Sequence, residues 1–157
     1  MASLNPENPS NSSIACVSSG KLPPCHKVSK NLILDGHVCE IVTSGVDVGR
    51  GAVLVPSTSA DRQVILSPGA VVIDVVGVSA QTGSSGNEVC MAVGGEFQVQ
   101  VAGAVTRGDF LASSATPGVA ESTGTGGNVG DFAIAMNSDS NVGTKLVWAR
   151  FKKAEVF

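Results

Sequence analysis

The sequence repeats itself at an interval of 57 residues, and this repeat limits the folds that the chain can adopt. Residues 46–93 align without a gap with residues 103–150, and ten of the 48 aligned pairs are identical. The stretch 50–54 returns as 107–111, and the glycine at 86 returns at 143. Because turn glycines and strand residues stay in phase, we predict one structural unit used twice: turn, strand, loop, strand, glycine turn and strand.

Composition predicts that this unit is made of strands. The chain has 24 Val against 8 Leu, 19 Gly and only 15% charged residues, and β-branched side chains favour a pleated surface over a helix. No stretch longer than ten residues has a clean helical period. We therefore predict an all-β fold, in which the two units pack as one small barrel or sandwich. The predicted strands are 28–34, 37–43, 52–56, 63–66, 70–79, 88–93, 96–101, 109–112, 131–136 and 145–151.

The amino-terminal segment differs from the rest of the chain. Residues 1–27 are rich in Pro, Ser and Asn, and such a segment sustains neither a helix nor a strand ladder. We predict an extended arm over 1–27 and a single β-domain over 28–157. The domain should open with a hairpin, because Asp35-Gly36 is suited to a two-residue turn.

Charge and hydropathy exclude several classes of function. The net charge is −3 and the sequence pI is about 5.2, so the chain lacks the basic surface with which proteins bind nucleic acid. No apolar run reaches the roughly 18 residues that span a bilayer, and no secretory signal is visible at the amino end. We expect neither nucleic acid nor a membrane as a partner, and we expect the four cysteines to be free thiols in a reducing cytoplasm.

The only two histidines lie close to two of the cysteines. Cys25-His26 followed by His37 and Cys39 has spacings that suit zinc. The hairpin at Asp35-Gly36 is the alternative, because it would place Cys25 about 23 Å from Cys39 at roughly 3.3 Å per residue. The same distance excludes a Cys25–Cys39 disulfide. We favour the hairpin without a metal; Cys16 and Cys90 are then left to pair elsewhere, and Cys90 is expected to be a buried thiol.

We predict no catalytic, cofactor-binding or metal-binding residues and expect that the protein is not an enzyme. Neither histidine accompanies a nucleophile motif, and Asp35, Asp109 and Asp131 adjoin glycines, a position that favours a role in turns. The glycine-rich stretch 124–130 lacks the Lys-Ser/Thr of a phosphate loop and precedes a strand. Arg107-Gly108-Asp109 spells an adhesion tripeptide, but the repeat places a turn there. Trp148 stands on the predicted strand 145–151, in which Leu146, Trp148 and Arg150 share one face and Val147, Ala149 and Phe151 the other. Both faces are largely apolar, and packing of Trp148 in the core is favoured over a role at an interface.

The second unit resembles a known group of proteins. Residues 103–111, 117–120, 130–136 and 143–147 are similar to the motifs of the capsid decoration, or cement, proteins of tailed phages, which have β-tulip-like domains. This resemblance covers residues 45–150. Residues 108–120 also resemble β-domains at the ends of phage tail spikes and fibres. The long Pro/Ser/Asn arm and the four cysteines depart from the usual cement pattern.

The resemblance implies a non-enzymatic structural protein of the virion. A cement protein would form a homotrimer on the outer surface of the capsid, assembled in the host cytoplasm, and would clamp neighbouring subunits of the major capsid protein. An extended arm suits that task, because its backbone can add to the sheet edge of another chain. The alternative is a trimeric tail-fibre or spike domain that binds a host receptor. The resemblance implies no cofactor.

Overall fold

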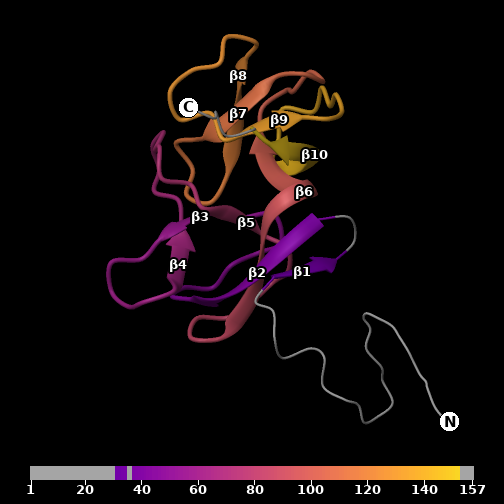
Figure 1. The fold of residues 1–157 in the computed structure, drawn as a ribbon. Helices are drawn as coiled ribbons and strands as arrows, with labels where there is room; N and C mark the ends of the chain where they lie inside the picture. Colours follow the sequence, from indigo (N-terminus) through magenta and orange to yellow (C-terminus); the bar gives the residue numbers. More distant parts are fainter. Residues whose placement is uncertain (1–30, 35–36, 153–157) are drawn as a thin grey trace, which may run out of the picture. The chain divides into compact units, whose positions relative to one another are not determined.

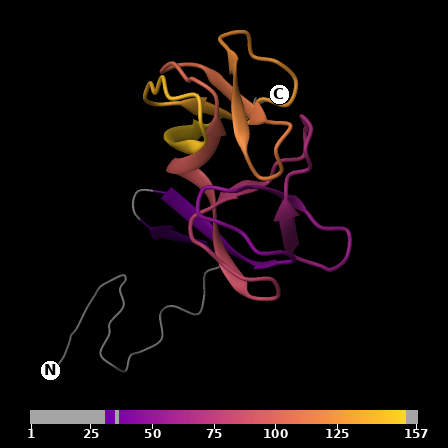
Figure 2. The ribbon, with the colours of Figure 1, turned by 180° about the vertical axis from the view of Figure 1, so that it is seen from behind.

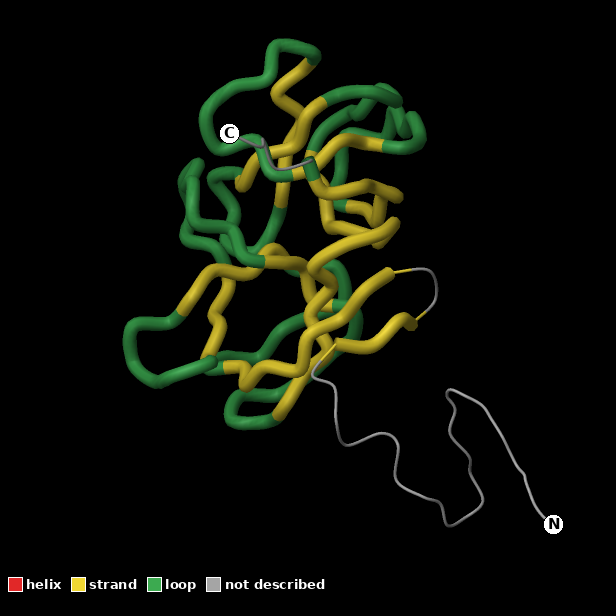
Figure 3. Tube along the Cα trace, viewed as in Figure 1, coloured by secondary structure: helices red, strands yellow, loops and turns green. Residues whose placement is uncertain are grey.

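The structure, a computed structural model, describes residues 31–34 and 37–152 (Figure 1). Residues 33–157 form one compact unit. Figure 3 shows strands connected by loops and turns over the described residues, so the predicted all-β fold class is confirmed. These residues include no helix that is long and apolar enough to cross a membrane. The predicted arm, residues 1–27, lies outside the described part of the chain.

Ten strands follow one another along the chain. They are β1 (Asn31–Leu34), β2 (His37–Ser44), β3 (Val53–Pro56), β4 (Gln63–Leu66), β5 (Gly77–Ser79), β6 (Glu88–Ala102), β7 (Phe110–Ser113), β8 (Ala120–Gly124), β9 (Ala133–Ala135) and β10 (Lys145–Phe151). The strands of the predicted hairpin are present as β1 and β2, whereas its turn at Asp35-Gly36 is not described.

Strand pairing closes two rings of five strands each. In the first barrel the order is β2-β4-β3-β5-β6, and β6 pairs again with β2. In the second barrel the order is β6-β10-β9-β7-β8, and β8 pairs again with β6. In each ring one pair is parallel, β2 with β4 and β6 with β8, and the other pairs are antiparallel.

The long strand β6 belongs to both barrels, and Figures 1 and 2 show it running from one to the other. Its residues up to Gly95 pair with β2, and its residues from Glu96 onward pair with β10. Gly95 has a φ of +75°, a left-handed conformation that glycine adopts without a steric penalty. The Gly94-Gly95 step therefore lets one strand leave the first barrel and enter the second.

The two barrels repeat one strand arrangement at the interval seen in the sequence. β7 begins 57 residues after β3, and each lies between its equivalent neighbours. Backbone hydrogen bonds repeat as well: Val48 exchanges two with Gly83, and Val105 exchanges two with Asp139. The fold is thus built from two similar units, but each unit closes its own barrel instead of completing a single one with the other. The 15 residues of β6 make this possible, because they serve both rings.

Apart from shifts of one or two residues at strand ends, three predicted strands differ from the observed ones over the described residues. Residues 88–93 and 96–101 form one strand, β6. Only Gly77–Ser79 of the predicted strand 70–79 is extended in the sheet, because Ser113 binds the preceding segment: its hydroxyl donates to the Ala70 carbonyl and accepts from the Val72 N–H. β8 was not predicted, since its second half is polar and ends in glycine.

Each barrel has its own apolar interior, and the strands between them are buried on both faces. The first interior contains Val42, Val48, Ala52, Leu54, Val64, Val89 and Met91. The second contains Phe97, Val99, Val101, Val105, Leu111, Ala120, Ala133, Ala135, Val147 and Ala149, and its cluster extends to Val53, Val78 and Ala92 of the first barrel. Neighbouring residues of β3, Val53 and Leu54, thus belong to different clusters. Burial on both faces explains why such strands are continuous apolar runs.

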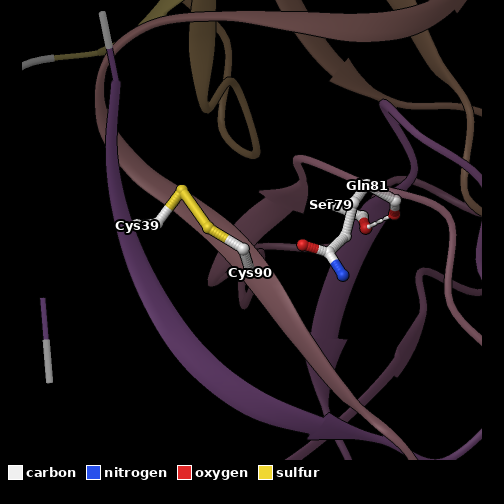
Figure 4. Close-up of a disulfide and its surroundings, with 4 residues drawn as sticks. All are labelled: Cys39, Ser79, Gln81 and Cys90. Atoms are coloured by element: carbon white, nitrogen blue, oxygen red, sulfur yellow. Dashed lines mark hydrogen bonds between the residues drawn. A yellow bond between two sulfur atoms is a disulfide. The ribbon is translucent and has the colours of Figure 1, made fainter. Parts of the chain in front are cut away.

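A disulfide joins Cys39 of β2 to Cys90 of β6, across the pair of strands that closes the first barrel (Figure 4). The Cα atoms lie 5.5 Å apart, and both residues are buried. The prediction of free thiols is therefore wrong for these two cysteines, and so is that of a buried thiol at position 90. Both residues are buried, so their sulfur atoms are shielded from thiol reductants in solution, and the compartment alone does not determine their redox state. Cys16 and Cys25 are outside the described residues.

Besides the bonds of the Ser113 hydroxyl to Ala70 and Val72, hydrogen bonds link the two barrels at two further places. At one of them the Val53 N–H donates to the Gly118 carbonyl, at 2.8 Å, and the Gly118 N–H donates to the Ser67 carbonyl and hydroxyl. At the other, the Gln100 N–H donates to the Gly51 carbonyl, at 2.9 Å. Since these are bonds between backbone groups or to a buried serine, the barrels pack as one body.

Gly51 and its repeat equivalent Gly108 provide a matched pair for testing this second link. Both have left-handed φ, +84° and +96°, but a Cβ on Gly51 would lie 2.6 Å from Leu146 Cδ2 and 3.0 Å from the Gln100 nitrogen, whereas one on Gly108 would meet nothing within 4 Å. We expect Gly108→Ala to lower the free energy of unfolding by about 1–2 kcal/mol through backbone strain. Gly51→Ala should cost roughly 1–3 kcal/mol more, because it also forces overpacking.

Urea unfolding followed by circular dichroism measures both variants. Equal losses for Gly51→Ala and Gly108→Ala would mean that the contact between the barrels at Gly51 is looser than the structure shows.

Candidate functional site

One outward face of the second barrel exposes large side chains. On β10 the residues alternate: Val147 and Ala149 are buried in the barrel, whereas Leu146, Trp148 and Arg150 point outward and are exposed. This alternation is as predicted. Trp148, however, is 40% exposed, so the prediction that it packs in the core is wrong.

Neighbouring strands extend this surface on both sides of β10. Residues of β6 and β10 pair in register, and Met136 follows β9 and donates its N–H to the Trp148 carbonyl, at 2.8 Å. We call this surface the β10 face. It comprises Glu96, Gln98 and Gln100 of β6, Leu146, Trp148 and Arg150 of β10, and Ile134 and Met136.

The β10 face combines an apolar centre with one charge of each sign. Met136, Leu146 and Trp148 are 38%, 41% and 40% exposed. Glu96 and Arg150 form an ion pair of 3.3 Å at one end of the face. Trp, Met and Arg are enriched in protein interfaces. This arrangement is suited to binding another macromolecule by its surface.

A second apolar surface lies on loops, away from the strands. Val71, Ile73 and Val129 are 55%, 79% and 82% exposed. The two loops that carry them are adjacent, because a Cβ on Gly130 would lie 2.7 Å from a methyl group of Val71. We call these three residues the loop patch.

The carboxylates singled out in the sequence hold turns. Asp109 Oδ2 accepts hydrogen bonds from the Thr106 N–H, at 2.9 Å, and from the Ser122 hydroxyl, at 2.7 Å. The tripeptide Arg107-Gly108-Asp109 therefore forms the turn before β7 that the repeat predicts. Its Asp is occupied by contacts within the chain.

Asp131 has the same role in the glycine-rich loop. It accepts hydrogen bonds from the Thr123 hydroxyl, at 2.7 Å, and from the Asn128 N–H. The loop connects β8 to β9, and a strand follows it as predicted. The roles predicted for Asp109 and Asp131 are confirmed, and Asp35 is outside the described residues.

The possible zinc arrangement is incompatible with the disulfide. It requires a thiolate at Cys39, whose sulfur is bonded to Cys90. Cys25 and His26 lie outside the described residues. Elsewhere in the described chain, no group of three or more His, Cys, Asp or Glu side chains is placed to hold a metal ion.

Two features of the structure were not predicted from the sequence. The Cys39–Cys90 pair depends on β2 meeting β6, a contact between residues 51 positions apart. Met136 joins the β10 face because β9 pairs with β10. Neither pairing has a local signature, although the alternation of β10 correctly assigned Trp148 to the same face as Leu146 and Arg150.

The fold is similar to that of a solved phage protein. The crystal structure of the head fiber gp8.5 N base in bacteriophage phi29 superposes with a TM-score of 0.53 and 17% sequence identity. The match covers 76% of this chain and 97% of the phi29 chain. At this identity the similarity concerns the fold. No protein-family model matches the chain, and no curated protein matches it.

Proposed function

We propose that the chain is a structural protein of a phage virion, a decoration or cement protein on the outer surface of the capsid. The observation that carries the proposal is the similarity in fold to the phi29 head fiber base, nearly all of which is matched. The motif resemblance over residues 103–147 supports the same class of protein independently. The proposed protein is not an enzyme and needs no cofactor.

The proposed mechanism is a non-covalent clamp between neighbouring subunits of the major capsid protein. The two barrels are closed rings, so their contacts with other chains are made by outward side chains such as those of the β10 face and the loop patch. Residues 1–27 would reach adjacent capsid subunits and add to their sheets as an extended strand. Other copies of this chain, as a homotrimer, complete the proposed set of partners.

The low charge of the chain supports this set of partners. With 10 basic and 13 acidic residues, the chain has no excess of positive charge for nucleic acid or an anionic membrane. Binding to a capsid protein requires no excess of positive charge, because specific protein interfaces are about as apolar as the rest of a protein surface.

A second candidate function is a trimeric tail-fibre or spike domain that binds a host receptor. The phi29 neighbour is itself named as part of a fiber, which favours this alternative. It predicts binding to a host glycan or surface protein. The cement function instead predicts binding to the capsid lattice.

The cement function is tested by heating particles made with and without this chain. We expect particles that lack it to release their genome at a lower temperature, because the clamps between capsid subunits are missing. Dye access to the released DNA measures the transition. Adding the purified full-length protein back to the deficient particles should restore their heat resistance. Equal release temperatures for the two kinds of particle would contradict the clamp.

A further inference from the structure

Equivalent outward positions differ in exposure between the two barrels. By strand register, the outward positions of β6 and β10 in the second barrel have equivalents on β2 and β6 in the first. The pairs Glu96–Arg150 and Gln98–Trp148 correspond to Cys39–Ala92 and Ile41–Cys90. On β10 this correspondence is displaced by one residue from the gapless 57-residue alignment, which places Trp148 opposite Met91. Cys39, Ala92 and Cys90 are at most 4% exposed and Ile41 is half-buried, whereas their equivalents carry the β10 face, on which Trp148 and Arg150 are exposed. The duplicated chain thus covers this surface in one barrel and leaves it open in the other.

The open surface is complementary in charge to a copy of itself. Glu96 and Arg150 have side chains that are 42% and 59% exposed, so each can meet a second charge as well as its partner within the chain. A partner surface of one sign would match only one of the two. A second β10 face offers Arg150 to Glu96 and Glu96 to Arg150.

The β10 face also continues into a contact that is already present. Leu146 lies against Gly51 at the link between the barrels, where Gln100 donates hydrogen bonds to the carbonyls of both Gly51 and Arg50. A copy seated on the face would extend this packed region instead of starting a separate one.

We infer that the β10 face binds the β10 face of another copy of this chain, with Trp148 as its anchor and with Glu96 and Arg150 paired across the interface. This inference goes beyond the proposed homotrimer, because a reciprocal contact between two identical faces joins two copies about a twofold axis. It does not depend on attachment to a capsid, so it is tested with the isolated full-length protein.

Trp148 reports on its own burial, because it is the only Trp in a chain without Tyr. As the protein concentration rises, its emission should shift to shorter wavelength over the same range in which sedimentation shows assembly. Trp148→Ala should weaken self-association by about 30-fold or more, as expected for an interface hot spot. Val129→Ala is the matched control: Val129 is 82% exposed on the loop patch, and its loss should leave assembly unchanged.

A mixing experiment distinguishes pairing between copies from the ion pair within a copy. Glu96→Arg and Arg150→Glu each give a face with two like charges, and each variant alone should assemble at least tenfold more weakly than the wild type. An equimolar mixture of the two should recover assembly, with mixed species seen by native mass spectrometry. The double variant Glu96→Arg/Arg150→Glu should assemble as the wild type does.

Three results would overturn the inference. One is a protein that stays monomeric while its Trp148 emission does not change with concentration. Another is a mixture of the two charge variants that recovers nothing although the double variant does, because the ion pair would then act only within a copy. The third is a shift of Trp148 emission that needs added capsids, which would assign the face to the capsid. None of these three results would contradict the cement function.

Discussion

Reduction of the Cys39–Cys90 disulfide is expected to lower the free energy of unfolding by about 4 kcal/mol. The bond closes a loop of 51 residues, and the cross-link removes a corresponding amount of conformational entropy from the unfolded chain. Small domains are stable by only roughly 5–15 kcal/mol in total. The loss should therefore lower the urea concentration at the midpoint of unfolding substantially.

The location of the disulfide explains why the first barrel should be affected most. Cys39 and Cys90 tie β2 to β6, the pair that closes the ring of the first barrel. The second barrel has no described cysteine, and its equivalent strands are joined by hydrogen bonds and the Glu96–Arg150 ion pair. We expect amide hydrogen exchange in the reduced protein to increase first in β2 and β4.

The experiment uses a chain carrying Cys16→Ser and Cys25→Ser, so that only Cys39 and Cys90 can pair. Urea unfolding is measured by circular dichroism with and without reductant, and mass spectrometry counts the two hydrogens that the disulfide lacks. The substitutions at 16 and 25 should leave the midpoint of the oxidised protein unchanged. Identical midpoints with and without reductant would show that the bond does not stabilise the fold.

Truncation of Leu54 or Leu111 to alanine should cost about 2–5 kcal/mol in each case. The two residues are 57 positions apart, both are 0% exposed, and each belongs to the apolar interior of its own barrel. Each substitution removes a packed side chain and leaves a cavity that neighbouring strands cannot close. Denaturant unfolding gives the loss for each variant.

Leu146→Ala is the matched control for this pair. The side chain of Leu146 is 41% exposed on the β10 face and contacts only the edge of the link at Gly51, so its removal from the monomer should cost about 1 kcal/mol, well below the loss for the two buried leucines. A large loss for one buried leucine and a negligible loss for its equivalent would contradict the view that both barrels are packed cores.

Local sequence patterns predicted the strands well. β4 and β10 begin and end at the predicted residues, and alternation along β10 divided its residues correctly between two faces. β8 contains Ser122, Thr123 and Gly124, whose residue types do not favour a strand. The repeat does indicate a strand there, because residues 120–123 lie 57 positions after β4.

Contacts between residues far apart in the chain could not be predicted from local sequence patterns. The ring closures, the Cys39–Cys90 bond and the use of β6 by both barrels each depend on which strands meet, and short apolar strands carry little information about their partners. Trp148 illustrates the same point for the candidate site. Its strand has apolar residues on both faces, and only the closed ring shows which face is inside.

The copy number of the chain in purified particles decides whether it is a structural component that covers the capsid surface. Quantitative mass spectrometry compares its peptides with those of the major capsid protein. For a cement protein we expect a copy number of the same order as that of the major capsid protein. A much lower number would favour the fibre alternative, and absence of the chain from purified particles would contradict the account.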